Sequence, residues 1–79
     1  MVRLKRIKKD KEFIEAYYTP EDSQEEGYLK IRLSDKEVVE RRLTSFDGVL
    51  FSYYVHARSE LRRICDEATV PESRLVMWY

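Results

Sequence analysis

Cysteine, histidine, glycine and proline are all scarce in this chain, and it carries no net charge. Its 79 residues include one Cys, one His, two Gly and two Pro, and 15 basic side chains balance 15 acidic ones. A single Cys cannot form an internal disulfide, which disfavours a secreted protein because small secreted domains normally need disulfides. The zero net charge removes any global electrostatic attraction to nucleic acid or to a membrane.

Other absences exclude common kinds of site. Two glycines are too few for a glycine-rich phosphate loop. No apolar run approaches the roughly 18 residues of a membrane span. Residues 1–11 are basic, but no apolar segment follows them, so we expect no signal peptide and a cytoplasmic location.

The side chains that could support catalysis are poorly placed for it. His56 and Glu60 share a helical face, but zinc needs three protein ligands and no second His is present, so an exposed His beside a Glu is the simpler interpretation. Cys65 lies on an apolar stripe, about 13 Å along the helix axis from His56, which favours a buried packing role. We therefore predict no enzyme activity, no cofactor and no metal.

The composition favours one folded domain spanning residues 1–79. Hydrophobic residues make up 43% of the chain, charged residues 38% and aromatic residues 13%, which is typical of a folded globule rather than a disordered segment. Residues 1–11 are strongly basic and residues 12–26 strongly acidic. If these blocks form neighbouring strands, we expect them to neutralise each other in part.

Alternating hydrophobic patterns predict strands at residues 2–5, 12–19, 28–33 and 38–44. Ile7 breaks the alternation of the first strand, which indicates a bulge or the end of that strand. Residues 19–22 have the features of a helix start, but the acidic segment after them has no apolar anchor, so a solvated loop before Gly27 is favoured. The side chains expected on the covered face are Ile14, Ala16, Tyr18, Leu29, Ile31, Leu33, Val39, Arg41 and Leu43.

An apolar stripe follows with helical spacing, at Leu50, Tyr54, Ala57, Leu61, Ile64, Cys65 and Ala68. Pro71 should end this helix by about residue 69. Residues 74–79 then predict a fifth strand, apolar on both sides. The expected fold is an α+β domain of order ββββαβ, a mainly antiparallel sheet with one amphipathic helix on one face.

Two positions are open for the last strand. It could lie antiparallel beside the first strand, or parallel to the fourth through a right-handed crossover. We favour the first arrangement because it leaves the strand with the inward Arg41 at an edge, where the guanidinium can reach water.

The uncovered sheet face is the candidate interaction surface, formed by Tyr17, Tyr28, Lys30, Arg32, Arg42 and, from the last strand, Trp78. Aromatic residues anchor protein interfaces, so contact with a protein partner or self-association is the favoured function. Mixed aromatic and basic side chains on an open sheet also suit single-stranded nucleic acid, which is the alternative. No membrane partner and no small-molecule substrate are expected.

Three segments carry a resemblance: Tyr-Tyr-x-Pro-acidic at residues 17–21, His56-Ala57 and Val-Met-Trp-Tyr at residues 76–79. With these segments the chain resembles short uncharacterised bacterial proteins that end in Val-Met-Trp-Tyr. The resemblance implies a bacterial cytoplasmic protein and no particular activity.

Overall fold

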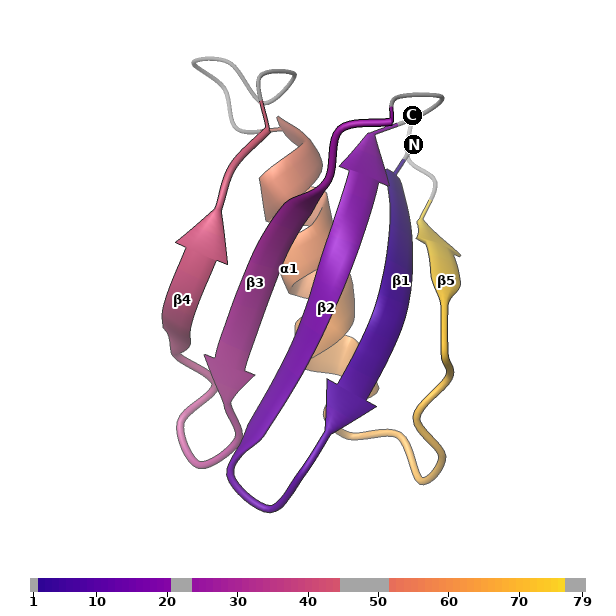
Figure 1. The fold of residues 1–79 in the computed structure, drawn as a ribbon. Helices are drawn as coiled ribbons and strands as arrows, with labels where there is room; N and C mark the ends of the chain where they lie inside the picture. Colours follow the sequence, from indigo (N-terminus) through magenta and orange to yellow (C-terminus); the bar gives the residue numbers. More distant parts are fainter. Residues whose placement is uncertain (1, 21–23, 45–51, 77–79) are drawn as a thin grey trace.

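The fold is a five-stranded antiparallel sheet with one helix across it (Figure 1). The computed structural model describes residues 2–20, 24–44 and 52–76. The sheet order is β4-β3-β2-β1-β5, and all four neighbouring pairs are antiparallel. The predicted α+β fold and the place of the last strand beside the first are therefore confirmed. The elements are β1 (Val2–Lys9), β2 (Phe13–Pro20), β3 (Gly27–Arg32), β4 (Val38–Arg42), α1 (Ser52–Ile64) and β5 (Arg74–Val76).

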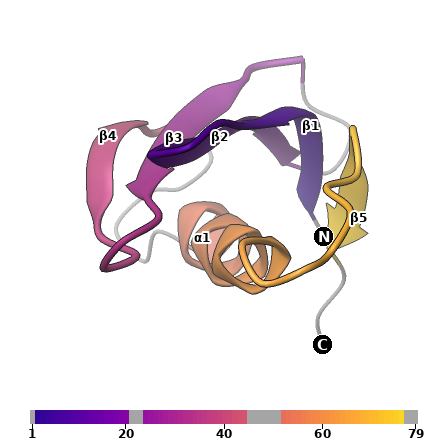
Figure 2. The ribbon, with the colours of Figure 1, turned by 90° about the horizontal axis from the view of Figure 1, so that it is seen from below.

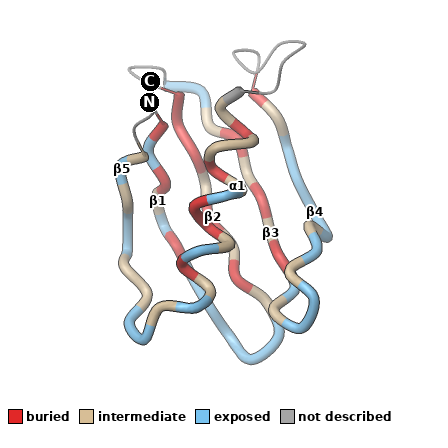
Figure 3. Tube along the Cα trace, turned by 180° about the vertical axis from the view of Figure 1, so that it is seen from behind, coloured by how far each residue is buried: buried red, intermediate tan, exposed pale blue. Residues whose placement is uncertain are grey.

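The core lies between the sheet and α1. The sheet curves around the helix, and the opposite face has no described element over it (Figure 2). Buried positions run along the central strands and the inner side of α1 (Figure 3), as the alternating and helical patterns predict. Each fully buried aliphatic side chain contributes about 1.5–3 kcal/mol. The fully buried core residues are Val2, Leu4, Ile14, Ala16, Tyr18, Leu29, Ile31, Ala57, Leu61 and Ile64.

A bulge interrupts β1 where Ile7 breaks the alternation. The pairing with β2 shifts between Lys5 and Lys8, and Arg6 has a positive φ of 52°. The extra residue lets Ile7 turn back into the core, where it is buried. Its N–H donates to the carbonyl of Glu72 at 3.1 Å. The bulge therefore keeps β1 amphipathic and ties it to the segment that leads into β5.

Gly27 begins β3, which differs from its expected place at the end of a loop or helical turn. Thr19 and Pro20 likewise belong to β2, whereas residues 21–23 of the predicted loop lie outside the described residues. Tyr18 and Gly27 are cross-strand partners, and a Cβ at position 27 would overlap the Tyr18 ring. Glycine is therefore needed here for close approach.

β4 is an edge strand with a bulge of its own. Because of this bulge, Val39 does not lie on the covered face of the sheet, where it was predicted to be. Lys30 pairs with Glu40 but Ile31 pairs with Val38, so Val39 is the extra residue. Val38 packs against the core in its place, and Val39 is 39% exposed. Arg41 pairs with Leu29, which puts it on the inward face at an edge, as predicted.

The helix is shorter than predicted. It ends at Ile64, after which the N–H groups of Asp66 and Glu67 each bond to the carbonyl three residues earlier. The Cys65 carbonyl accepts a hydrogen bond from Lys9 Nζ at 3.1 Å, which satisfies one of the free carbonyls at the helix end. Ala68 lies beyond this tight turn and is exposed, so the expected stripe stops before it. Leu50 lies outside the described residues.

Glu60 lies off the predicted apolar stripe of the helix but is buried, and His56, expected to be exposed beside it, is half-buried. The Glu60 side chain accepts hydrogen bonds from Arg74 at 2.8 Å and from Arg63 at 3.3 Å. Arg74 also binds both carboxylate oxygens of Glu67, at 2.7 and 2.8 Å. This cluster joins β5 to the helix. Hydrogen bonds from Arg74 lower the pKa of the Glu67 carboxyl group.

Candidate interaction surface

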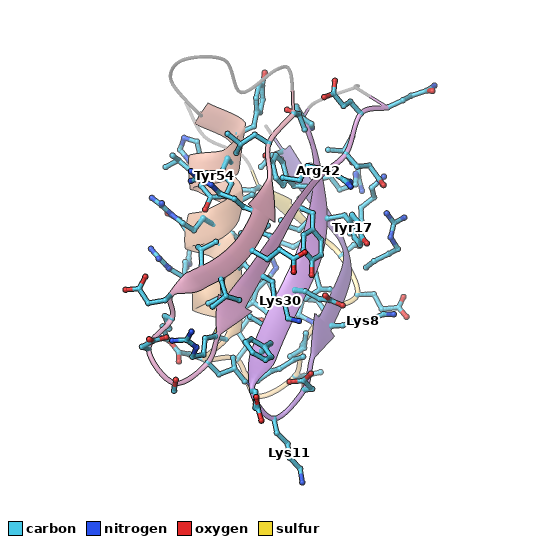
Figure 4. All side chains as sticks on the ribbon, turned by 60° about the vertical axis from the view of Figure 1, so that its left-hand side comes forward. Lys8, Lys11, Tyr17, Lys30, Arg42 and Tyr54 are labelled. Carbon is cyan, nitrogen blue, oxygen red and sulfur yellow. The ribbon has the colours of Figure 1, made fainter. Side chains whose placement is uncertain are left out.

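Most of the residues predicted for the interaction surface lie on the outer face of the sheet, which is the face turned away from α1. Strand alternation points Tyr17 of β2, Tyr28, Lys30 and Arg32 of β3, and Arg42 of β4 away from α1. Figure 4 shows Tyr17 and Lys30 projecting on the side of the sheet opposite the helix. Trp78, the sixth predicted residue, lies outside the described residues.

An aromatic pair occupies the middle of this face. The ring centroids of Tyr17 and Tyr28 are 5.1 Å apart and tilted by 55°, a favourable geometry for two aromatic rings. The Tyr28 hydroxyl donates to Glu15 Oε2 at 2.5 Å. Burial raises the pKa of Tyr28 above its usual range, and the hydrogen bond to Glu15 adds to the effect. The Tyr28 hydroxyl therefore stays protonated well beyond neutral pH.

Cations cover the rings of this face. The guanidinium carbon of Arg6 lies 4.3 Å from the centroid of the Tyr17 ring. Lys30 Nζ lies 4.5 Å from the centroid of the Phe13 ring. Both distances are within the range of cation–π attraction. The two rings are thus already stacked against cations of the same chain.

Glu26 connects the basic and acidic blocks of the sequence. Lys5 Nζ and Arg6 Nη2 contact its two oxygens at 2.8 and 2.6 Å. The hydrogen bonds from Lys5 and then Arg6 lower the pKa of Glu26. The expected neutralisation between the two blocks is found at this residue.

The end of the face near the β1–β2 turn is hollowed. A depression of about 460 Å³ is lined by Lys8, Lys9, Asp10, Phe13, Glu15 and Lys30. Asp10 shapes the turn, since its Oδ1 accepts the N–H groups of Glu12 and Phe13, both at 2.8 Å. These backbone hydrogen bonds lower the pKa of Asp10. The Asp10 carboxylate therefore stabilises the β1–β2 turn.

The remaining predicted residues lie towards the edges of the face. Arg32 forms an ion pair with Asp35 at 3.0 Å, and Arg42 Nη2 donates to the Glu26 carbonyl at 3.3 Å. In β5, Leu75 pairs with Arg3 on the outer face and is 44% exposed. Val76 packs towards the core instead. For the described part of the last strand, Leu75 is therefore the side chain that the core leaves uncovered.

The side chains considered above for catalysis or metal binding are His56, Glu60 and Cys65. Cys65 is half-buried and packs against the core, and burial raises the pKa of its thiol. The carboxylate of Glu60 is engaged by arginines. Within residues 2–20, 24–44 and 52–76, no group of three or more His, Cys, Asp or Glu side chains could hold a metal ion. No helix in that same part of the chain is long and apolar enough to cross a membrane.

Comparison with known proteins gives no relative: no family model, no curated protein and no solved structure matches the chain significantly. Functional reasoning therefore rests on the geometry of the surface.

Arg6 and Glu26 belong to this surface, but the sequence pattern did not predict either of them as a surface residue. In a regular strand, Arg6 would lie on the same covered face as Val2 and Leu4. The bulge instead brings it beside Lys5, over Tyr17. The broken alternation at Ile7 is the signal that could have found it.

Proposed function

We propose that this chain is a small non-enzymatic cytoplasmic protein that binds a protein partner through the outer face of its sheet. The observation that supports this best is the aromatic pair of Tyr17 and Tyr28 on a sheet face that no described element covers. Leu75 extends the apolar part of that face at one edge. Aromatic side chains with a polar rim are typical of protein interfaces.

The face has the size of an ordinary interface. The Cα trace extends over 31 × 22 × 21 Å, and a standard interface buries about 800 Å² on each partner. The two longest extents enclose roughly 680 Å² (31 × 22), so a partner of standard size would have to use the whole of this face. We expect the partner to cover most of the face rather than a corner of it.

The internal pairs on this face favour a protein partner over nucleic acid. Bases stack on free ring faces, but Arg6 covers the Tyr17 ring and Lys30 covers the Phe13 ring. Glu15 and Glu40 add negative charge to the same side of the sheet. A folded protein surface with both signs of charge complements this arrangement better than a polyanion does.

Charge-reversal variants test the proposal. Lys30→Glu changes the middle of the face, whereas Lys11→Glu makes the same charge change at the exposed β1–β2 turn. Each protein, checked for folding by circular dichroism, is used to capture partners from native lysate with and without nuclease. We expect a nuclease-resistant partner that Lys30→Glu loses and Lys11→Glu retains. Equal capture by both variants would contradict the proposal.

Self-association through the same face is the second form of the proposal. Sedimentation equilibrium over a range of concentrations should then show a dimer that Lys30→Glu weakens and Lys11→Glu does not. A wild-type chain that stays monomeric in this experiment excludes self-association and leaves only a different protein as partner.

Single-stranded nucleic acid remains a second candidate because of one observation. A shallow groove of about 590 Å³ beside β1 is lined by Arg3, Lys5, Arg6, Ile7, Lys8, Glu72 and Ser73. If phosphates bind there, affinity for short RNA or DNA should fall steeply between low and moderate salt. If neither nucleic acid shifts the resonances of Arg3, Lys5 and Arg6 in the groove or of Tyr17, Tyr28, Lys30 and Arg32 on the outer face, this function is excluded.

A further inference from the structure

A second groove lies on the other side of the sheet, between the edge strand β4 and α1. Its volume is about 330 Å³, and its lining comprises residues 37–41 of the β4 edge together with Tyr54, Arg58 and Arg62 of α1. Figure 4 shows Tyr54 extending from α1 on the β4 side of the molecule. The groove lies along the β4 edge, and Glu40 of its lining belongs to the outer face.

The arginines of this groove differ from four of the other six arginines in what they contact, whereas Arg3 and Arg42 likewise form no ion pair among the described residues. Arg6, Arg32, Arg63 and Arg74 each bind a carboxylate. Within the described part of the chain, the three arginines that line the groove have no ion pair, and two of them, Arg58 and Arg62, are half-buried whereas Arg41 is exposed.

The three guanidinium groups are nevertheless held in place. The guanidinium carbons of Arg41 and Arg58 lie 5.4 and 5.5 Å from the centroid of the Tyr54 ring. Arg62 Nε donates to the Lys36 carbonyl at 3.1 Å, which leaves its terminal N–H groups for another acceptor. Arg58 and Arg62 are one helical turn apart and so share a face of α1.

Arg58 also has an unused donor. Its Nε is buried and has no hydrogen-bond partner among the described residues. Buried N–H groups without an acceptor are uncommon and unfavourable. A ligand in the groove would meet the terminal N–H groups of Arg58, because the buried Nε is closed to it.

Glu37 and Glu40 are the acidic residues of the lining. Glu40 is the cross-strand partner of Lys30 on the outer face, and its charge acts on Tyr28 there. Glu37 lies at the β3–β4 turn, where its N–H donates to Asp35 Oδ1 at 3.1 Å. Three arginines against two glutamates (3 − 2) leave the lining with a net charge of +1.

We propose that the groove formed by Arg41, Tyr54, Arg58 and Arg62 binds a phosphate monoester. Guanidinium groups bind phosphate oxygens through paired hydrogen bonds. A monoester carries about −1.5 to −2 charges at neutral pH, which matches several unpaired arginines better than one carboxylate does. The ester is either part of a small molecule or a phosphorylated side chain, and both present the same group to the arginines.

The test is an NMR titration of the folded chain at constant ionic strength. The probes are inorganic phosphate, phenyl phosphate and a short phosphoserine peptide, with chloride as the reference anion. We expect saturable shifts of the Tyr54, Arg58 and Arg62 amides, with at least one organic ester binding more tightly than inorganic phosphate. Stronger binding of phenyl phosphate would indicate a small molecule, and stronger binding of the peptide a phosphorylated protein.

Matched arginine variants separate a site from general attraction. Arg58→Gln and Arg62→Gln should each weaken binding about tenfold or more, as expected for a lost charged hydrogen bond. Arg42→Gln removes the same charge from the outer face and should leave the affinity within about twofold. Equal weakening by all three variants, or no saturation by about 10 mM ester, would overturn the proposal. Neither result depends on the partner of the outer face.

Discussion

Replacing Gly27 with alanine should destabilise the domain, although alanine is normally the better residue inside a strand. On propensity alone, the change should add about 0.5–1 kcal/mol of stability. At this position the new Cβ would overlap the Tyr18 ring. That ring is fully buried, and its centroid lies 6.4 Å from that of Tyr54. Because the ring is fully buried, it can move only by displacing its core neighbours, and we expect a net loss of about 1–3 kcal/mol, as for an overpacked core.

Urea unfolding measures this change. The midpoint should fall while the slope stays constant, and the melting temperature should fall by about 4–8 °C for each kcal/mol lost. Tyr18→Leu removes the ring atoms that the Cβ would meet, so Gly27→Ala should become neutral or stabilising in that background. The double-mutant cycle would then show strong coupling between the two positions. A higher midpoint for Gly27→Ala in the otherwise unchanged chain would refute the reasoning.

Three further changes test individual contacts. Arg74 lowers the pKa of Glu67, so the stability from this pair is present above the ordinary Glu value of 4.5 and is lost as pH falls through the lowered pKa. Glu67→Gln should therefore reduce the urea midpoint at neutral pH, with the difference from the unchanged chain vanishing in strong acid. Asp10→Ala should lower the melting temperature more than Asp10→Asn, because an Asn side-chain oxygen can still accept the two N–H groups of the turn. In an ultraviolet absorbance titration, Tyr28→Phe should remove a tyrosine that ionises above the ordinary tyrosine pKa, since burial and Glu15 raise the pKa of Tyr28.

Much of the fold follows from local pattern in the sequence. The alternation of Ile14, Ala16 and Tyr18 predicts which side of β2 the helix covers, and all three side chains are fully buried. The break at Ile7 predicts the bulge that the pairing shows. The position of the last strand depends on one inference, that a charged inward residue such as Arg41 belongs at an edge. These predictions succeed because each depends on the neighbours of a residue in sequence.

Predictions failed where a distant contact decides the outcome. Val38 and Val39 are equally apolar, so only the pairing with β3 shows that the bulge turns Val38 inward. Glu60 is an acid beside the apolar stripe of the helix, and its carboxylate is paired by Arg74, which lies 14 residues further along the chain. For the same reason the sequence indicates which bases lie on the outer face but not which of them are already bound within the chain.

Whether a basic side chain is already bound within the chain decides where an anion should bind. Cation–π contacts hold basic side chains both on the outer face and in the groove, but on the outer face Lys5 and Arg6 also share the carboxylate of Glu26. A ligand would have to compete with these internal contacts, so exposure alone overstates the attraction of that face for an anion. The groove beside Tyr54 has fewer bases, yet its arginines lack carboxylate partners in the described chain. An anion should therefore prefer the groove, and the outer face should bind mainly through its aromatic side chains.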